Sequence, residues 1–538
     1  MKKQIGICAL IAVLILAVTC TSQLMAEDHP DTATDTVSES VTDPATEYIT
    51  NTAFITAVER ATYINWTKEE NGTVPLTPEN LKAIRAVTKL YLSYAELTDL
   101  SGIEWFTGLE VLDCYKNRLT ELDLSQNTVL RELYCYENQL TELDLSHNPA
   151  LKWLYCSNNQ LTELDISHNP TLEELYCYGN QLRSLDLSQN TALIRLYCYN
   201  NQLTELDVSY NPQLKYLECY KNQLKELELS QNTVLKWLYC DKNQLTELDL
   251  SHNTALTTLA CGGNQLRLLN LSQNTALEWL YCYDNQLRSL DLSHNPALEI
   301  LYCYENQLTE LVLLQNTALT LLSCFDNQLR SLDVSQNTAL EVLYCGSNQL
   351  SGLDVSQNTA LELLDCSENQ LSDLDLSQNT ALEHLSCYEN QLRSLDLSHN
   401  TALRVLKCFD NQLRSLDVSH NTALEWLSCG DNQLRSLDVL QNTALEHLSC
   451  YENQLRSLDL SHNTKLIYLS CTNNQLSELD LSHNTYLEFL HCGSQKRDNG
   501  DVQQLTLTLT AEQRKKWDWY WADATDEDAN NYDVRIKE

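Results

Sequence analysis

The sequence contains little glycine and proline for its length, with twelve Gly and eight Pro among 538 residues. Because these two residues form most tight turns, Asn and Ser must supply much of the turn chemistry in this chain. Basic residues are scarce as well: 35 Lys and Arg stand against 74 Asp and Glu, and the formal net charge is -39. Nucleic acids and anionic membrane surfaces repel such a protein, so the composition excludes both as partners.

Signatures of catalysis are also missing from the sequence. It shows no nucleophile with an adjacent base, no zinc motif and no phosphate-binding loop. Every candidate His or Asp belongs to a position that recurs along the chain. We therefore expect a protein without catalytic activity, cofactor or metal, and an enzyme is the third choice after a binding protein and a structural protein.

The N-terminus has the features of an export signal. Two lysines at positions 2 and 3 precede an apolar stretch at 5–18, which is too short for a dependable membrane span. We therefore predict a signal peptide at residues 1–26 and a protein that is extracellular or attached to the cell surface. No later segment resembles a transmembrane helix or a wall-sorting signal.

Two ways of processing this signal stay open. Residues 24–26 (Leu-Met-Ala) suit an ordinary signal peptidase, whereas residues 16–20 (Leu-Ala-Val-Thr-Cys) resemble a lipobox in which Cys20 is lipidated. Thr19 differs from the small residue usual before that cysteine. In the second case a lipid on Cys20 is the only expected contact with a membrane.

The segment at 27–50 is predicted to be a disordered tether. It holds seven acidic residues and eight Ser or Thr but no Lys or Arg, so it cannot bury enough apolar surface to fold. Residues 51–90 predict a helical N-terminal cap instead. Phe54 and Val58 suit one helix face, and Thr77-Pro78 reads as an N-cap followed by proline at the first helical position.

A strict period of 21 residues dominates the rest of the chain. Nineteen cysteines follow one another at this spacing from Cys114 to Cys492. Each unit reads L-x-x-L-x-C-x-x-N-x-L-x-x-L-D-L-S-x-N-x-x, as in residues 130–150. Alternation around the cysteine indicates a short strand with one face turned inward. The pattern predicts a repeat solenoid at 91–495, with a parallel sheet of about 20 short strands.

This unit resembles the leucine-rich-repeat consensus L-x-x-L-x-L-x-x-N-x-L, with Cys in place of the third leucine. The resemblance covers roughly residues 87–495. The repeat unit is similar in particular to those of the internalins of the internalin J type, whose 21-residue repeats carry such a cysteine ladder. The resemblance implies an α/β-type solenoid, a right-handed superhelix with a concave parallel sheet. It also implies a bacterial surface protein whose ligands are proteins or glycoproteins of host cells or other microbes.

Three columns of the repeat, that is, residues at the same position in successive turns, have structural interpretations. The cysteines should be buried free thiols, because parallel in-register strands keep their Cβ atoms too far apart for disulfides and do not converge on a metal. The asparagines three residues after each Cys, from Asn117 to Asn474, should satisfy loop backbone groups. The aspartates equivalent to Asp144 should be solvated; hydrogen bonds to turn amides or bridging cations are the alternatives.

The C-terminal segment at 496–538 is predicted to be a cap made of a strand and a helix. Leu505, Leu507 and Leu509 alternate with Thr as in a strand, and Thr510 begins a capping-box pattern that opens a short helix. That helix would carry Trp517, Trp519, Tyr520 and Trp521. Such a lid would cover the apolar end of the last repeat.

The outward strand positions of the first half of the solenoid are rich in aromatic residues, and there we expect the ligand to bind. Lysines 152, 215 and 236 flank them, and from Ser323 onward the same columns become small and polar, with His384, His447 and scattered aromatic residues. Two other readings stay open, a stabilising ladder of stacked rings and a spacer role in the cell envelope. We expect a monomer that binds a protein or a glycan. The predicted ligand-binding residues are Tyr134, Tyr136, Trp153, Tyr155, Tyr176, Tyr178, Tyr197, Tyr199, Tyr216, Tyr220, Trp237, Tyr239, Trp279, Tyr281, Tyr283, Tyr302 and Tyr304.

Overall fold

The computed structural model describes residues 47–497, 500–515 and 534–536. The predicted signal peptide with Cys20, nearly all of the predicted tether and the four aromatic residues at 517–521 lie outside these ranges. The described residues from Tyr48 onward belong to one compact unit. In the described ranges no helix has the length and apolarity needed to cross a membrane.

Within the described residues, two helices precede the repeats. Helix α2 (Thr52–Ala61) is capped by Asn51, whose side chain accepts a hydrogen bond from the Phe54 N–H, and it buries Phe54 and Val58. Helix α3 (Pro78–Arg85) begins after Thr77, which caps it with Pro78 in the first turn. Strands β1 (Tyr48–Ile49) and β2 (Val74–Pro75) pair antiparallel beside them, and a single 3-10 turn, η1 (Ile103–Trp105), follows.

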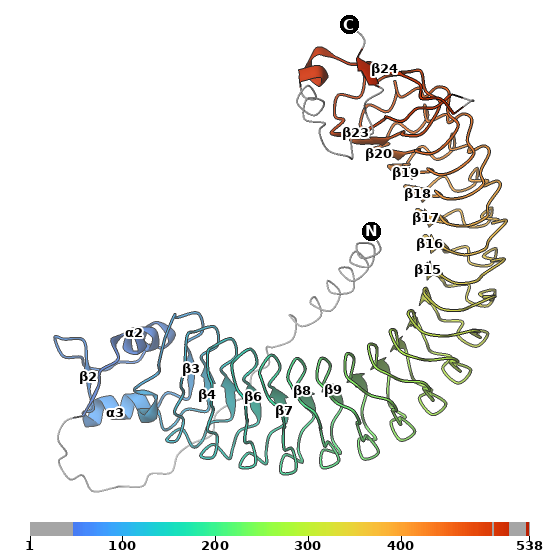
Figure 1. Cartoon of the computed structure of the whole chain (residues 1–538). Coiled ribbons are helices and arrows are strands. Elements are labelled where there is room, and N and C mark those ends of the chain that lie inside the picture. The colour runs from blue at the N-terminus through green and yellow to red at the C-terminus, as the bar shows by residue number, and fades with distance from the viewer. Residues whose placement is uncertain (1–46, 498–499, 516–533, 537–538) are drawn as a thin grey trace. The chain divides into compact units, whose positions relative to one another are not determined.

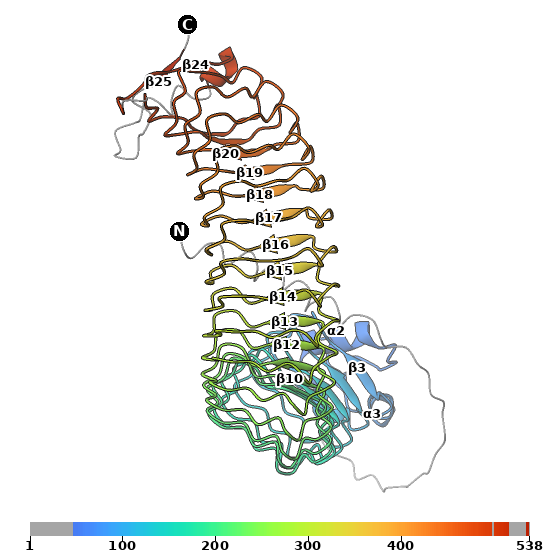
Figure 2. The same ribbon diagram turned by 90° about the vertical axis from the view of Figure 1, so that its right-hand side faces the viewer.

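The repeats form a parallel β-solenoid whose main sheet has 20 strands, as the period predicts. Each strand is three residues long and pairs in register with the strand one turn away, at the inner side of the curved solenoid (Figures 1 and 2). The strands are β3 (Lys89–Tyr91), β4 (Val111–Asp113), β5 (Glu132–Tyr134), β6 (Trp153–Tyr155), β7 (Glu174–Tyr176), β8 (Arg195–Tyr197), β9 (Tyr216–Glu218), β10 (Trp237–Tyr239), β11 (Thr258–Ala260), β12 (Trp279–Tyr281), β13 (Ile300–Tyr302), β14 (Leu321–Ser323), β15 (Val342–Tyr344), β16 (Leu363–Asp365), β17 (His384–Ser386), β18 (Val405–Lys407), β19 (Trp426–Ser428), β20 (His447–Ser449), β21 (Tyr468–Ser470) and β23 (Phe489–His491).

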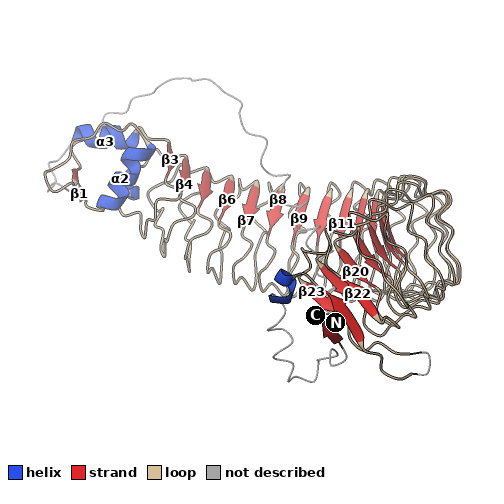
Figure 3. Cartoon of the chain, turned by 90° about the horizontal axis from the view of Figure 1, so that it is seen from above, coloured by secondary structure: helices blue, strands red, loops and turns tan. Residues whose placement is uncertain are grey.

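One continuous apolar core runs through the solenoid. In the turn that contains β5, Leu133 and Cys135 point inward from the strand, while Leu140 and Leu145 point inward from the opposite wall, and all four are at most 1% exposed. Figure 3 shows the strands on one side of the solenoid and the loops on the other. Because every turn contributes to the same core, no turn is expected to be stable alone.

The nineteen cysteines of the repeat are free and fully buried, which confirms the interpretation as a column of thiols. Burial raises the pKa of each thiol, for example that of Cys156 to about 12. A thiol that stays protonated is a poor nucleophile and a poor metal ligand. In this protein the column therefore acts as a stack of small apolar side chains.

The asparagines after the cysteines form the predicted ladder. Asn138 donates hydrogen bonds from Nδ2 to the carbonyls of Cys114 (3.0 Å) and Cys135 (3.1 Å), and its Oδ1 accepts one from the Leu119 N–H (3.0 Å). The pattern repeats in each turn. In the last turn Gln495 replaces the asparagine and makes equivalent bonds to the carbonyls of Cys471 and Cys492.

A second asparagine ladder, which was not predicted separately from the sequence, lies at the position of Asn148. Its side chain is 0% exposed, and Nδ2 donates to the carbonyls of Leu124 (3.1 Å) and Asn127 (3.0 Å) in the preceding turn. Oδ1 has no partner, here or in the equivalent residues up to Asn484. The side chains of this ladder therefore link each turn to the preceding one only through hydrogen bonds that Nδ2 donates.

The aspartates equivalent to Asp144 accept hydrogen bonds from turn amides. Asp144 Oδ1 accepts from the Ser146 N–H at 2.9 Å, and hydrogen bonds from Ser146 lower the pKa of this carboxyl group. These hydrogen bonds agree with the interpretation that the aspartates of this column are solvated and also bind turn amides. In the described part of the chain no group of three His, Cys, Asp or Glu side chains is placed to hold a metal ion.

One turn position has a backbone conformation that the sequence analysis did not foresee. The residue two after each cysteine has a positive φ, 53° at Glu137 and 67° at Gly179, for example. Glycine and asparagine suit this left-handed region, but Glu, Lys and Asp occupy it in most turns. Because the chain contains little glycine, residues with side chains occupy this left-handed position in most turns, at some cost in conformational energy.

The C-terminal end is closed by a second, three-stranded parallel sheet. Strand β22 (Glu478–Asp480) belongs to the last complete turn, and β24 (Leu505–Thr508) and β25 (Val534–Ile536) extend the wall opposite the main sheet. Thr510 and Gln513 form the predicted capping box, each side chain bonding to the other residue's backbone N–H.

Candidate binding surface

Three outward columns line the concave face of the main sheet. In the turn of β5 they are represented by Glu132 (first column), Tyr134 (second column) and Tyr136 (third column), on either side of the inward Leu133 and Cys135. Register is kept from turn to turn, so like positions lie about 4.8 Å apart along the solenoid. Large side chains in one column must therefore touch.

All seventeen predicted ligand-binding residues lie in these columns, in the turns of β5 to β13. The first column holds Trp153, Tyr216, Trp237 and Trp279; the second holds Tyr134, Tyr155, Tyr176, Tyr197, Tyr239, Tyr281 and Tyr302; the third holds Tyr136, Tyr178, Tyr199, Tyr220, Tyr283 and Tyr304. The period alone is enough to place them, because it fixes the register of every turn.

Most of these rings are stacked on one another. In the second column, Tyr155, Tyr176 and Tyr197 stack at centroid distances of 4.1 and 4.3 Å, with interplanar angles of 11° and 12°. The third column stacks Tyr199 on Tyr220 at 4.2 Å. Such rings hide their faces and present their edges and hydroxyl groups. They are half-buried, so this surface exposes less aromatic area than the sequence suggested.

Two indole rings stand out from this arrangement. Trp237 is 42% exposed and Trp279 is 38% exposed, and no other predicted residue is as open. They lie in β10 and β12, two turns apart, with Thr258 of β11 between them. Thr258 is 3% exposed, so the two indoles rise above a small buried residue. Paired exposed Trp side chains over a small floor are typical anchors for a ligand.

The turn between these indoles has only small residues in its outward columns. Thr258, Ala260 and Gly262 take the first, second and third positions. A Cβ atom on Gly262 would lie 2.6 Å from the Tyr283 ring, so this tyrosine packs directly over the glycine. The turn is therefore covered by a ring of the next turn rather than open to solvent.

Two carboxyl groups lie in the turns before β11, Asp241 one turn away and Glu218 two turns away. Burial raises the pKa of Asp241 to about 7 and that of Glu218 to about 7. Asp241 Oδ1 accepts a hydrogen bond from the Gly262 N–H at 3.2 Å. Near neutral pH these groups are partly protonated, so the surface carries less negative charge here than its composition suggests.

A polar network crosses the first and second columns. The hydroxyl of Tyr155 donates to Glu174 Oε2 at 2.8 Å, Glu174 forms an ion pair with Arg195, and the Arg195 guanidinium lies 4.9 Å from the Tyr216 ring centroid. This network fixes the orientation of side chains that a ligand would contact. Of the predicted flanking lysines, Lys152 pairs with Glu173 at 2.8 Å.

The aromatic columns extend further in both directions than the sequence analysis recognised. Tyr115 stacks on Tyr136 at 4.3 Å, and Phe325 stacks on Tyr304 at 4.5 Å. In the second half, where His447 and scattered aromatic residues interrupt the small polar columns, Trp426 and His447 stack at 3.5 Å. The sequence could have predicted these contacts, because each of these residues lies 21 positions from another aromatic residue or histidine.

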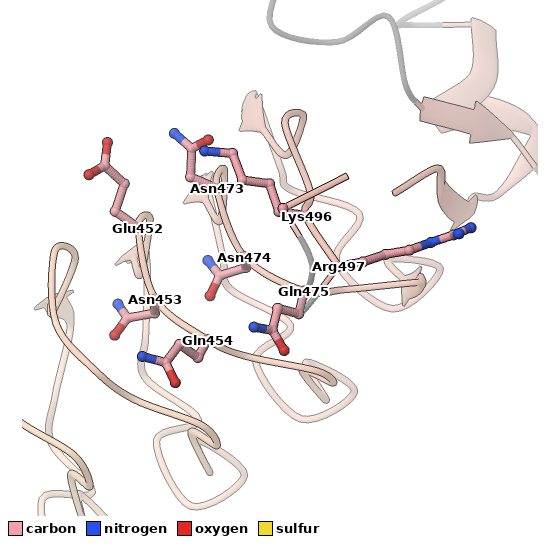
Figure 4. Close-up of a pocket in the computed structure, with 9 residues that line it drawn as sticks. Glu452, Asn453, Gln454, Asn473, Asn474, Gln475, Lys496 and Arg497 are labelled. Atoms are coloured by element: carbon pink, nitrogen blue, oxygen red, sulfur yellow. The ribbon is translucent and has the colours of Figure 1, made fainter. Parts of the chain in front are cut away.

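A hollow of about 600 Å³ lies apart from this face, near the C-terminal end (Figure 4). Its lining consists of amide and charged side chains from neighbouring turns, among them Glu452, Asn473 and Lys496. None of the predicted ligand-binding residues borders it.

Comparison with known proteins adds the following findings. Residues 149–190 match the family model described as leucine-rich repeats, two copies. No curated protein matches the chain. Among solved structures, the functional domain of InlJ from Listeria monocytogenes, which includes a cysteine ladder, is 30% identical, with 86% of this chain and 80% of that one covered and a TM-score of 0.40.

Two further bacterial structures are similar. YopM from Yersinia enterocolitica is 28% identical, with 78% of this chain and 92% of that chain covered and a TM-score of 0.64. A leucine-rich-repeat protein of Leptospira interrogans is 25% identical, with 66% and 100% covered and a TM-score of 0.60.

Proposed function

Because the chain belongs to the leucine-rich-repeat proteins, whose fold is a scaffold for binding other proteins, we propose that it is an exported, non-enzymatic recognition protein that binds its ligand through the aromatic concave face. The ligand is a protein or glycoprotein, and the protein acts as a bacterial adhesin or receptor of the internalin type. Its place is the cell exterior, with Cys20 as the lipid anchor if the lipobox is used.

The pair Trp237 and Trp279 carries this proposal. Both side chains are exposed on the concave side, and they lie two turns apart above Thr258. Indole rings supply large apolar area at low entropic cost, and such residues dominate the binding energy of many interfaces. The stacked tyrosines around them add a rigid surface of ring edges and hydroxyl groups, which suits a ligand with polar groups.

A structural role for the same rings is the second candidate function. Centroid distances of 4.1 to 4.3 Å between Tyr155, Tyr176 and Tyr197 support stabilisation of neighbouring strands, as in a spacer protein of the envelope. The two roles differ in which residues matter. Stacked residues carry the structural role, whereas the two exposed indoles carry recognition.

A screen of the purified chain against host proteins and a glycan array tests the proposal. The ligand found in this way is then measured against two double variants. Trp237→Ala with Trp279→Ala should abolish most of the affinity and leave the fold intact, whereas Tyr176→Ala with Tyr197→Ala should lower the melting temperature. If binding is the same in all variants that fold, the aromatic face is a spacer surface and not a recognition surface.

A further inference from the structure

Three serines form a second unusual feature of the concave face, near its C-terminal end. Ser428, Ser449 and Ser470 are the last residues of β19, β20 and β21 and occupy the second outward column. We name these three residues the serine row. The strands lie side by side in register, so the hydroxyl groups repeat about every 4.8 Å along the solenoid (Figure 2).

The residues of the serine row are buried, and their hydroxyl groups have no hydrogen-bond partner among the described residues. The three residues are 9%, 7% and 7% exposed. Throughout the described residues, no side chain or backbone group forms a hydrogen bond with any of these three hydroxyl groups. The hydroxyl oxygens are not completely enclosed, so they reach the concave surface, while the polar groups of the strands beneath are already paired within the sheet. Because the row faces outward, its hydrogen-bonding capacity is available to a molecule on the concave face.

An aromatic wall borders the serine row in the first outward column. The Trp426 ring stacks on His447 at 3.5 Å, and His447 stacks on Tyr468 at 4.2 Å, with interplanar angles of 5° and 3°. Trp426 is 39% exposed, and His447 Nδ1 is buried without a hydrogen bond. Burial lowers the pKa of His447 to about 4, so the wall is uncharged at neutral pH.

The other border of the serine row lies in the third column. A Cβ atom on Gly430 would lie 2.4 Å from the Tyr451 ring, so that ring covers the glycine and rises beside the row. The borders carry the negative residues Glu446, Asp431 and Glu452, and Lys407 precedes Ser428 in the second column, with its Nζ 6.0 Å from the Trp426 ring centroid. The serines themselves carry no charge, which suits a neutral ligand.

We propose that the serine row and the wall of Trp426, His447 and Tyr468 form a binding site for a neutral oligosaccharide that runs along the solenoid. A serine hydroxyl both donates and accepts, and so does each hydroxyl group of a sugar. Aromatic side chains offer apolar surface to the C–H groups of the same sugar rings. A peptide that binds by strand addition would instead need free main-chain donors and acceptors, and those of β19, β20 and β21 are occupied by the sheet.

This site lies in turns distant from Trp237 and Trp279, so it is separate from the proposed recognition surface. Titration calorimetry of the full chain with cellohexaose, chitohexaose and mannohexaose tests it. At least one should bind, with the same affinity in the Trp237→Ala, Trp279→Ala variant. Replacing all three serines by alanine should weaken that binding by at least about tenfold.

Stability separates a binding role from a structural one. Because the hydroxyl groups have no partner, the triple serine variant should melt at the same temperature as the wild type or higher. The matched control replaces Ser415, Ser436 and Ser457 by alanine, three exposed serines of successive turns outside the main sheet, and should bind as the wild type does.

Two outcomes overturn the proposal: none of the three sugars binds, or the triple serine variant binds sugar as well as the wild type. A random-peptide library screened on the same variants provides the third outcome. Peptides that bind the wild type but not the triple serine variant, in the absence of sugar binding, would assign the row to a peptide instead.

Discussion

The side chain of Gln513 donates a hydrogen bond of 3.0 Å to the backbone carbonyl of Asn484, although 29 residues separate them. Its Nε2 also donates to the Leu481 carbonyl at 2.8 Å. These are the two bonds that the next asparagine of the second ladder would make, as Asn484 itself makes them to Leu460 and Asn463. In the C-terminal cap, Gln513 therefore takes the place of the next asparagine and ends the second ladder.

Replacing this glutamine tests whether it closes the ladder. Gln513→Ala removes one of two donors from each of the Leu481 and Asn484 carbonyls, which keep their backbone donors, and should cost about 1–2 kcal/mol. The loss should be local, so hydrogen exchange should speed up in residues 481–492 and stay unchanged in the first ten turns. Glu512→Ala, at an exposed neighbouring position, is the control. Equal protection in both variants would mean that the cap is held by other contacts.

A pair of glycines tests the packing of the aromatic face. Gly262→Ala places a methyl group 2.6 Å from the Tyr283 ring, which must move, and should destabilise the protein by about 1–3 kcal/mol. Gly352→Ala meets nothing within 4 Å and should be neutral or stabilise by up to about 1 kcal/mol. Thermal unfolding measures both. Similar melting temperatures for the two variants would show that Tyr283 is not held against the glycine.

The stability of the protein should fall as the pH rises from about 4 to about 8. Burial raises the pKa of Asp241 and of Glu218 from ordinary values near 4 to about 7, so in this range the folded state binds more protons than the unfolded state. Stability therefore decreases with pH, and a shift of this size in Asp241 corresponds to roughly 4 kcal/mol.

Neutral replacements isolate this effect from the general repulsion among acidic groups. Asp241→Asn combined with Glu218→Gln should make the melting temperature depend less on pH between 5 and 8 than in the wild type. Glu247→Gln, which changes an exposed carboxyl group in the same turn as Asp241, should leave the slope as it is. An unaltered slope in the double variant would show that the two carboxyl groups are already ionised in the folded state.

The repeat and the orientation of its columns could be predicted from the sequence, because one period of 21 residues assigns every side chain to the core or the outside. Leu133, Cys135 and Asn138 take the places expected of them. The second ladder could not be recognised, since Asn148 stands in a Ser-x-Asn turn where a solvated residue is equally common. Only the path of the backbone brings it inside.

The closure by Gln513 and the exposure of single rings were also beyond sequence reasoning. Gln513 lies outside the repeat register, so no column points to its role. Ring exposure depends on the residue one turn away: Tyr176 has tyrosines on both sides and is half-buried, while Trp279 follows the small Thr258 and is open. The sequence shows which residues face outward but not how much of each is accessible.

The affinity of the Trp237→Ala, Trp279→Ala variant for the ligand from the protein and glycan screen tests the recognition claim most directly. Each indole should contribute about 2 kcal/mol or more, so the double variant should bind at least a hundredfold more weakly at an almost unchanged melting temperature. The Tyr176→Ala, Tyr197→Ala variant should show the reverse, a lower melting temperature with most of the affinity kept. Wild-type affinity in the tryptophan variant would contradict recognition through the concave face.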